Sequence, residues 1–250
     1  MTALELATTL PAPAPIERGG GRPTKGGYRN AKGEEIPSVT TVLGATTPKP
    51  ALVGWAYKRG QENLPLYASR DAAGEIGQSV HGGVEEFEYS GALPTFAELR
   101  DQAMGEEKIS PRESARLAFE KYRDWRAWSR FDIVAMEVPL VSERLGFAGT
   151  PDTIAIRDGK LTLLDWKTSG GIYAEYLLQI AAYALLWEDL RGGHFEGFEI
   201  LRLAKDGSDF EHRAWTRAEL EEANVFSAWR RSLELYTFQS PIKALLKKAA

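Results

Sequence analysis

The chain has 250 residues, of which 43% are hydrophobic and 26% charged, and its formal net charge is −4. These values predict one globular domain with no membrane-spanning segment, and the acidic balance argues against a broad surface that coats nucleic acid. The sequence contains no cysteine, which excludes disulfides and thiolate metal sites and favours a cytoplasmic location. No secretory leader is expected near Met1.

The two ends differ in composition from the middle of the chain. Residues 1–24 are rich in proline and glycine and are expected to be disordered. A single domain is expected over residues 25–240, followed by a basic tail at residues 241–250. Within the domain, residues 28–33 and 36–43 predict a hairpin or a strand that leads into a short β-rich segment.

Two helices are predicted next, over residues 47–59, with Pro50 near the first turn, and over residues 71–89. The second has an apolar stripe but also four glycines, each of which costs up to about 1 kcal/mol in a helix. The glycines indicate either close approach of another backbone or a ligand, or an end of the helix near Gly82. The stripe and the glycines are Ala73, Ile76, Val80, Val84 and Phe87, and Gly74, Gly77, Gly82 and Gly83.

The rest of the chain alternates between strands and helices. Ser-Pro-Arg-Glu at 110–113 and Thr-Arg-Ala-Glu at 216–219 are capping boxes that begin helices. The predicted elements are a helix to about residue 130, a strand at 133–141, a hairpin at 149–167, a helix at 174–191, a hairpin at 198–215 and a helix to about residue 236. This order predicts an α/β (α+β) fold, a central mixed sheet flanked by helices.

The Asp-Gly pair at 158–159 lies between two runs of alternating apolar residues, which is typical of a hairpin with a two-residue loop. If Arg157 pairs with Lys160, the register places Asp152 opposite Asp165. Directly opposed carboxylates lie about 5 Å apart and repel each other. A divalent cation between them would turn this repulsion into a binding site.

Lys167 shares the face of Asp165 because side chains alternate along a strand. Asp-x-Lys by itself is a weak pattern, and Glu-Glu-Lys at 106–108 and Asp-Gly-Lys at 158–160 match it too. Only residues 165–167 end an apolar strand whose partner carries Pro-Asp. The same face carries apolar residues, and buried charges are rare unless they bind something. We therefore predict a metal-dependent phosphodiesterase site at Asp152, Asp165 and Lys167.

Further candidates lie outside the hairpin. His81 is a possible metal ligand, although a helical histidine is more often a surface or core residue. Glu85, four residues later, projects to the same side. Glu137, in the strand before the hairpin, is a further acidic candidate. Gln179 and Tyr183 are i,i+4 neighbours that could hydrogen-bond a phosphate or orient the site.

Four segments in this order carry a family resemblance: Gly-Gln-Ser-Val-His at 77–81, Gly-Thr-Pro-Asp at 149–152, Leu-Asp-Trp-Lys-Thr-Ser at 164–169 and Gln-Ile-Ala-Ala-Tyr at 179–183. Together they resemble the motifs of RecB-type exonucleases in the PD-(D/E)XK superfamily. Residues 36–43 are similar to the start of the mitochondrial genome maintenance and phage-encoded members. The resemblance implies a restriction-endonuclease-like core and a DNA substrate in a bacterial or phage-infected cell.

The resemblance also implies roles for individual residues. His81, Asp152, Asp165 and the Trp166 carbonyl would hold Mg²⁺ or Mn²⁺, and Lys167 would position the attacking water. Gln179 and Tyr183 would complete the site on the DNA side. Some members carry an iron–sulfur cluster on four cysteines, which this cysteine-free chain cannot hold. The implied activity is exonucleolytic, in DNA recombination, repair or replication; a structure-specific endonuclease and an inactive DNA-binding module are the alternatives.

Overall fold

The computed structural model describes residues 16–21, 23, 27–103 and 108–248. Most of the N-terminal segment that is expected to be disordered lies outside these residues. Within it, however, strand β1 (Glu17–Arg18) pairs in parallel with β4 (Asp132–Met136). The strand departs from the expectation of disorder because its backbone hydrogen-bonds to the sheet edge, where the Gly19 amide also donates to the Met136 carbonyl at 2.9 Å.

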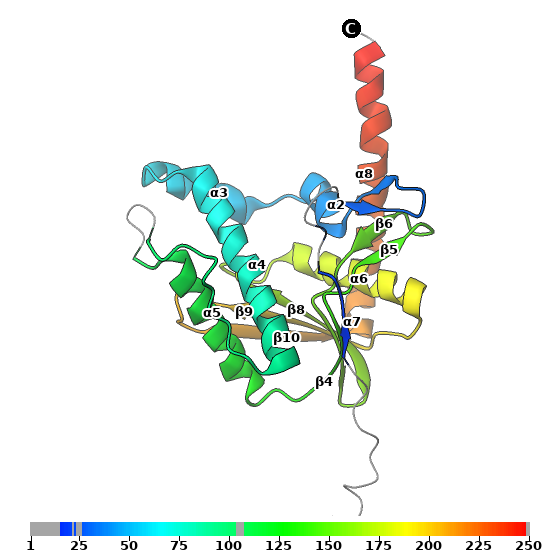
Figure 1. The fold of residues 1–250 in the computed structure, drawn as a ribbon. Helices are drawn as coiled ribbons and strands as arrows, with labels where there is room; N and C mark the ends of the chain where they lie inside the picture. Colours follow the sequence, from blue (N-terminus) through cyan, green and yellow to red (C-terminus); the bar gives the residue numbers. More distant parts are fainter. Residues whose placement is uncertain (1–15, 22, 24–26, 104–107, 249–250) are drawn as a thin grey trace, which may run out of the picture.

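The centre of the fold is a mixed sheet of six strands, in the order β1-β4-β7-β8-β9-β10 (Figure 1). The β1–β4 and β8–β9 pairs are parallel, and the other three are antiparallel. This topology confirms the predicted central mixed sheet. The further strands are β7 (Thr153–Arg157), β8 (Lys160–Lys167), β9 (Gly197–Leu203) and β10 (Phe210–Thr216).

The β7–β8 hairpin has the predicted register, in which Arg157 pairs with Lys160 and Ile154 with Leu163. Its loop residues Asp158 and Gly159 both have positive φ, of 51° and 75°. Positive φ at both positions is the geometry of a type I′ turn, whose twist matches that of the strands. The local sequence therefore fixes the pairing that brings Asp165 and Lys167 to one face of this hairpin.

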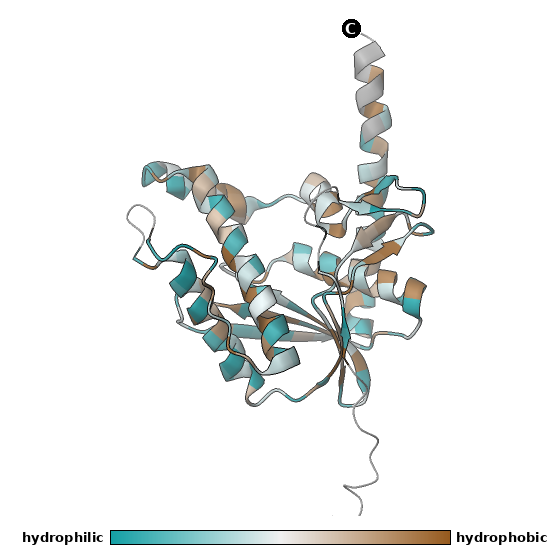
Figure 2. Ribbon diagram, in the orientation of Figure 1, coloured by the Kyte–Doolittle hydropathy of each residue, from teal (hydrophilic) through white to brown (hydrophobic). Residues whose placement is uncertain are grey.

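Helices cover both faces of the sheet (Figure 1). Helix α6 (Ala174–Arg191) packs on the face that carries Leu163, whereas α4 (Leu66–Ser90) and α5 (Pro111–Arg126) pack on the face that carries Leu164. In Figure 2 the outer side of α5 is largely hydrophilic, as expected for a helix with one buried stripe. Among the described residues, no helix combines the length and apolarity needed to cross a bilayer.

The hairpin predicted within residues 28–43 is confirmed as a short β2–β3 pair, and the extended structure predicted for residues 39–43 is wrong. Only Glu35–Ile36 are extended, as strand β3 paired with β2 (Tyr28–Arg29), and Val39–Thr46 form helix α2. Ser38 caps this helix by accepting a 3.0 Å hydrogen bond from the Thr41 amide. Val39 and Val42 are fully buried in the core beside α6. Tertiary burial therefore overrides the β-propensity of these branched residues.

Helix α3 (Pro50–Gln61) follows α2 and confirms the predicted helix with Pro50 in its first turn, although the predicted start at residue 47 is too early. Helix α4 then runs through the whole glycine cluster and ends at Gly91, whose φ is +73°, so it does not end near Gly82. A Cβ on Gly83 would lie 2.9 Å from the Phe96 ring, whereas a Cβ on Gly74 or Gly82 would contact nothing within 4 Å. Gly83 therefore serves packing inside the protein, and the other two face open space.

The strand predicted at residues 133–141 is interrupted. Strand β4 ends at Met136, Glu137 has a φ of +48°, and β5 (Leu140–Ser142) pairs with β6 (Phe147–Gly149) in a separate small sheet. The predicted final helix is also divided. The capping box at Thr216 begins the short α7 (Arg217–Glu222), and Asn224, with a φ of +58°, separates it from α8 (Val225–Lys248).

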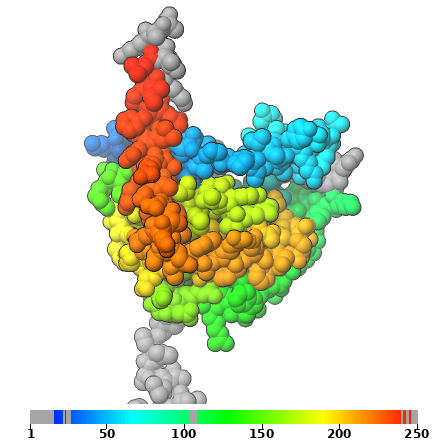
Figure 3. All heavy atoms as spheres, turned by 180° about the vertical axis from the view of Figure 1, so that it is seen from behind, coloured from blue at the N-terminus to red at the C-terminus, as the bar shows by residue number. Residues whose placement is uncertain are grey.

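Helix α8 extends past the predicted end near residue 236 and includes residues 241–248, which are expected to be a tail. Seen from behind in Figure 3, its orange turns lie against the body of the protein and its red turns project beyond it. The N-terminal turns contribute Trp229, which is fully buried against Phe147. This half of α8 therefore belongs to the core beneath α6, and the projecting half does not.

Candidate active site

Three side chains from three elements converge at one end of the sheet. His81 on α4, Glu137 after β4 and Asp152 before β7 each present a ligand atom, and these atoms all lie within 4.8 Å of one another. The Nδ1 atom of His81 lies 3.3 Å from Asp152 Oδ1 and 3.5 Å from Glu137 Oε1. The structure thus brings the predicted residues His81 and Asp152 together. It also adds Glu137, a minor candidate from the sequence, to the same cluster.

The position of α4 depends on a close contact near His81. A Cβ on Gly77 would lie 3.3 Å from Thr168 Oγ1, in the segment that follows β8. Such a contact is tight, so a larger residue would push the helix away from the strand end. Gly77 therefore lets α4 approach closely enough for His81 to reach Asp152.

Asp152 is almost wholly buried, and its Oδ2 accepts a 2.8 Å hydrogen bond from the Trp166 amide on β8. This bond fixes the carboxylate across the hairpin and leaves Oδ1 directed at His81. The predicted role of the Trp166 carbonyl as a metal ligand stays a prediction. The structure adds a role for the backbone amide of Trp166, which orients the Asp152 carboxylate.

Asp165 lies beside this cluster rather than within it. It is fully buried and forms an ion pair with Lys167 through Oδ2. Burial raises the pKa of Asp165 to about 6, an effect that Lys167 opposes and the nearby charge of Asp152 reinforces. Apart from Lys167, no described residue donates a hydrogen bond to either carboxylate oxygen. An acid this deeply buried is expected to bind a cation.

Lys167 has a second neighbour that the sequence gave no reason to select. Its Nζ lies 4.9 Å from the centre of the Tyr176 ring on α6. Burial raises the pKa of Tyr176 to about 12, so the hydroxyl stays neutral near pH 7. The ring face stabilises the ammonium through a cation–π interaction, and Lys167 is therefore held between a carboxylate and an aromatic ring.

Gln179 and Tyr183 on α6 are both buried, and Gln179 Nε2 donates to Tyr183 Oη at 2.9 Å. The Tyr183 ring packs so closely on Gly149 that a Cβ there would lie 2.5 Å from Cε1. The pair therefore supports the segment that leads to Asp152. A direct contact of either residue with DNA stays a prediction.

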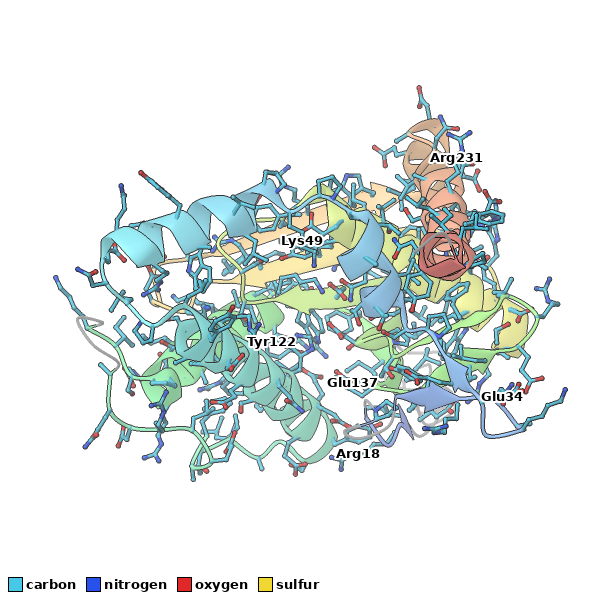
Figure 4. The ribbon with its side chains drawn as sticks, turned by 90° about the horizontal axis from the view of Figure 1, so that it is seen from above. Arg18, Glu34, Lys49, Tyr122, Glu137 and Arg231 are labelled. Carbon is cyan, nitrogen blue, oxygen red and sulfur yellow. The ribbon has the colours of Figure 1, made fainter. Side chains whose placement is uncertain are left out.

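Glu85 lies on α4 one turn after His81, and its Oε1 accepts a 3.0 Å hydrogen bond from Arg18 Nε. Burial raises the pKa of Glu85, the pairing with Arg18 lowers it, and the charge of Glu137 raises it again. Arg18 thus offsets part of the negative charge of the site. Figure 4 labels Arg18 and Glu137 beside the C-terminal half of α4.

An open pocket of about 670 Å³ lies over this cluster. Its lining includes His81, Glu85 and Glu137, together with Gly74 and Gly82. The two glycines leave the wall of α4 without side chains, so a ligand can approach the helix backbone. The pocket thus gives His81, Glu85 and Glu137 access to a large substrate.

The donor set fits a divalent cation such as Mg²⁺ or Mn²⁺. Carboxylate oxygens suit both ions, and one imidazole is compatible with Mn²⁺-like ions. The buried carboxylate oxygens of Asp165 support a metal site independently. Apart from the ion pair with Lys167, they have no hydrogen-bond partner among the described residues. We conclude that His81, Glu137 and Asp152, with Asp165 beside them, could hold a metal.

Comparison with known proteins identifies the family. Residues 54–241, more than half of the chain, match the PD-(D/E)XK nuclease superfamily. The chain therefore belongs to the PD-(D/E)XK nuclease superfamily, as the four sequence motifs predict, and its fold is that of a nuclease. No curated protein matches the sequence.

The solved structures that are similar to this chain include two of LHK-Exo. One is LHK-Exo in complex with dAMP, with 12% identity and a TM-score of 0.39 over 86% of this chain and 95% of that chain. The other is the alkaline exonuclease LHK-Exo from Laribacter hongkongensis, with 14% identity and a TM-score of 0.31 over 52% of this chain and 71% of that chain.

Proposed function

We propose that this protein is a metal-dependent DNA exonuclease that hydrolyses phosphodiester bonds from DNA ends, with a single strand threaded through its site. The observation that carries the proposal is the convergence of His81, Glu137 and Asp152 beside the Asp165–Lys167 pair, beneath an open pocket. The wider roles that fit such an activity are DNA recombination, repair and replication. The cytoplasmic location favoured by the cysteine-free sequence stays a prediction.

The residues divide into those that hold the ion and those that act on water. His81, Glu137, Asp152 and Asp165 would hold Mg²⁺ or Mn²⁺. When bound, such an ion polarises a phosphate oxygen and lowers the pKa of a bound water. Trp166 keeps Asp152 in place through its amide, and Tyr183 supports the same segment from α6.

Lys167 is the residue to which we assign the attacking water. Its ammonium is only slightly exposed and is held by Asp165 and the Tyr176 ring. From this position it would orient the water and offset the negative charge that develops on the phosphate in the transition state. Because Lys167 is paired with the Asp165 carboxylate, we assign Lys167 an electrostatic role first.

The test uses end-labelled linear DNA and circular single-stranded DNA, each incubated with Mn²⁺, Mg²⁺ or EDTA. An exonuclease releases nucleotides from the linear substrate only with metal and leaves the circle intact. Nicking of the circle would instead identify an endonuclease on the same core. Binding of DNA without any metal-dependent cleavage would overturn the proposed activity.

A further inference from the structure

Helix α3 is not explained by the core. All of its twelve residues are described, and none is buried. Tyr57 is 69% exposed and Val53 71% exposed. In Figure 1 the helix lies at one end of the molecule, beside the start of α4 and away from the sheet. Because an isolated helix of this length is marginal in water, its position suggests a function outside the core.

A second pocket, of about 300 Å³, lies between α3 and the body of the protein. Its lining includes the half-exposed Trp55 of α3, with the Arg59 guanidinium 5.5 Å from the centre of the Trp55 ring. Two lysines from other elements complete the charged part of the lining, Lys108 before α5 and Lys205 after β9. Among the described residues that line the pocket, Asp206 is the single acidic one. This cationic lining contrasts with the net charge of −4 of the whole chain.

The floor of this pocket is apolar and is formed by α4, where Ala72 and Ile76 are buried. An aromatic ring, an apolar floor and several cations are the groups that bind an unpaired nucleobase and its neighbouring phosphates. A base pair inside a duplex offers no free ring face to such a pocket, because its faces are already stacked. The chemistry of the pocket therefore selects single-stranded nucleic acid.

The two pockets meet on α4, because Ala73 lines both of them. His81 follows eight residues later, which is about 12 Å along a helix axis. Gly74 and Gly82 leave the surface between them open, with no atom within 4 Å of a Cβ at either position. That span corresponds to roughly three or four stacked nucleotides, so one strand could occupy both pockets at once.

We propose that the pocket of Trp55 is a second binding site for the single-stranded DNA substrate, a few nucleotides from the scissile phosphate. Trp55 stacks on an unpaired base, and Arg59, Lys108 and Lys205 contact the adjacent phosphates. The strand crosses α4 at Ala73 and Gly74 between this pocket and the metal cluster. The inference rests on the proposed function, which supplies DNA as the substrate. It adds to that function the residues that hold the single strand away from the metal cluster.

The test measures binding in EDTA, where no cleavage occurs, by fluorescence anisotropy of labelled oligothymidylates of two and twelve nucleotides. Trp55→Ala should raise the dissociation constant of the 12-mer roughly 5- to 100-fold, whereas Trp55→Phe should retain most of the affinity. The dinucleotide, which cannot occupy the metal cluster and the Trp55 pocket together, should bind the wild-type protein more weakly than the 12-mer does. Tyr57→Ala, on the same helix but outside the pocket, is the matched control.

Arg59→Gln provides a second measurement, which does not depend on stacking. Loss of one phosphate contact should reduce the slope of log K against log salt concentration by about 0.7. Unchanged 12-mer affinity in a folded Trp55→Ala variant would overturn the inference, and so would an equal loss of affinity for duplex DNA. Failure of wild-type protein to cleave any DNA would overturn the proposed function alone, because the binding measurements need no cleavage.

Discussion

The backbone amide of Glu137 donates a 3.1 Å hydrogen bond to the carbonyl of Asp152. This bond continues the β4–β7 ladder one residue past the Met136–Thr153 pair, and it joins two of the residues that surround His81. Glu137 accepts a φ of +48° at this point, a conformation that costs a residue with a side chain of the order of 1 kcal/mol. The backbone strain is located where the carboxylate turns toward the imidazole.

Replacement of this carboxylate tests the ligand set. Glu137→Gln should lower the affinity for Mn²⁺ at least about tenfold, because it removes one anionic ligand atom while it keeps the side-chain shape. Titration of Mn²⁺ by isothermal calorimetry measures the effect. Glu196→Gln, at an exposed position, is the control, and equal affinities of the two variants would exclude Glu137 as a ligand.

The buried carboxyl of Asp165 predicts a pH dependence. Its pKa is raised to about 6 in the folded protein, so without metal this group contributes stability at low pH that is lost as the pH rises through about 6. Metal binding requires the ionised form and therefore strengthens over the same range. The Mn²⁺-induced rise in Tm should be larger at pH 7.5 than at pH 5.

Asp165→Asn should remove most of that rise at pH 7.5, as measured by differential scanning fluorimetry. Asp158→Asn, in the turn of the same hairpin, should leave it unchanged. A full Mn²⁺ effect in the Asp165 variant would place the metal elsewhere.

Lys167 and Lys160 lie at opposite ends of β8 and allow a matched comparison. Lys167→Ala should lower kcat roughly 10²- to 10⁴-fold at saturating Mn²⁺, because the ammonium acts on water and transition-state charge. Lys160→Ala, in the exposed turn, should retain wild-type kinetics. Near-normal turnover of the folded Lys167 variant, measured with end-labelled DNA, would make the residue a structural counter-ion of Asp165.

A substitution at Gly82 can distinguish an effect on DNA binding from an effect on the stability of the fold. Gly82→Ala should stabilise the protein by about 0.5–1 kcal/mol, since the added Cβ meets no atom and alanine favours helix. The same Cβ would narrow the pocket over the site and raise KM for DNA. Urea denaturation and steady-state kinetics measure the two effects, and a variant that is more stable with an unchanged KM would contradict the predicted strand path.

Gly19 and Gly20 test whether the N-terminal segment belongs to the folded domain. A Cβ on Gly19 would lie 1.8 Å from the Glu137 carbonyl oxygen, whereas one on Gly20 would meet nothing within 4 Å. Gly19→Ala should therefore lower the free energy of unfolding by roughly 1–3 kcal/mol, and Gly20→Ala should not. Equal stability of the two variants would show that the segment does not pack on the site.

Local sequence signals predicted those parts of the fold that depend on local chemistry. The Asp-Gly turn specified the register of β7 and β8, and the alternation of residues placed Asp165 and Lys167 on one buried face. Helix α2 was not predicted from the sequence, because burial of Val39 and Val42, rather than their intrinsic propensity, decides its structure. No local sequence pattern predicts that these two valines are buried.

The position of Glu137 in the His81–Asp152 cluster could not be predicted either. Strand periodicity assigns it a face but not a left-handed backbone, and that conformation depends on the hydrogen bond to Asp152 and the close approach of Gly19. Tyr176 was missed for a similar reason, since its contact with Lys167 joins a helix to a strand end through space. Signals of this kind exist only in the folded chain.

The region that matches the nuclease superfamily begins at residue 54, yet the buried Val39 and Val42 and the paired strand β1 all precede it. A fragment trimmed to residues 54–241 would expose an apolar surface on α6 and leave Glu85 without Arg18. We expect such a fragment to aggregate on expression. A unit suitable for crystallisation or biochemical work therefore includes the segment from Ile16 onward and is longer than the boundaries of the family indicate.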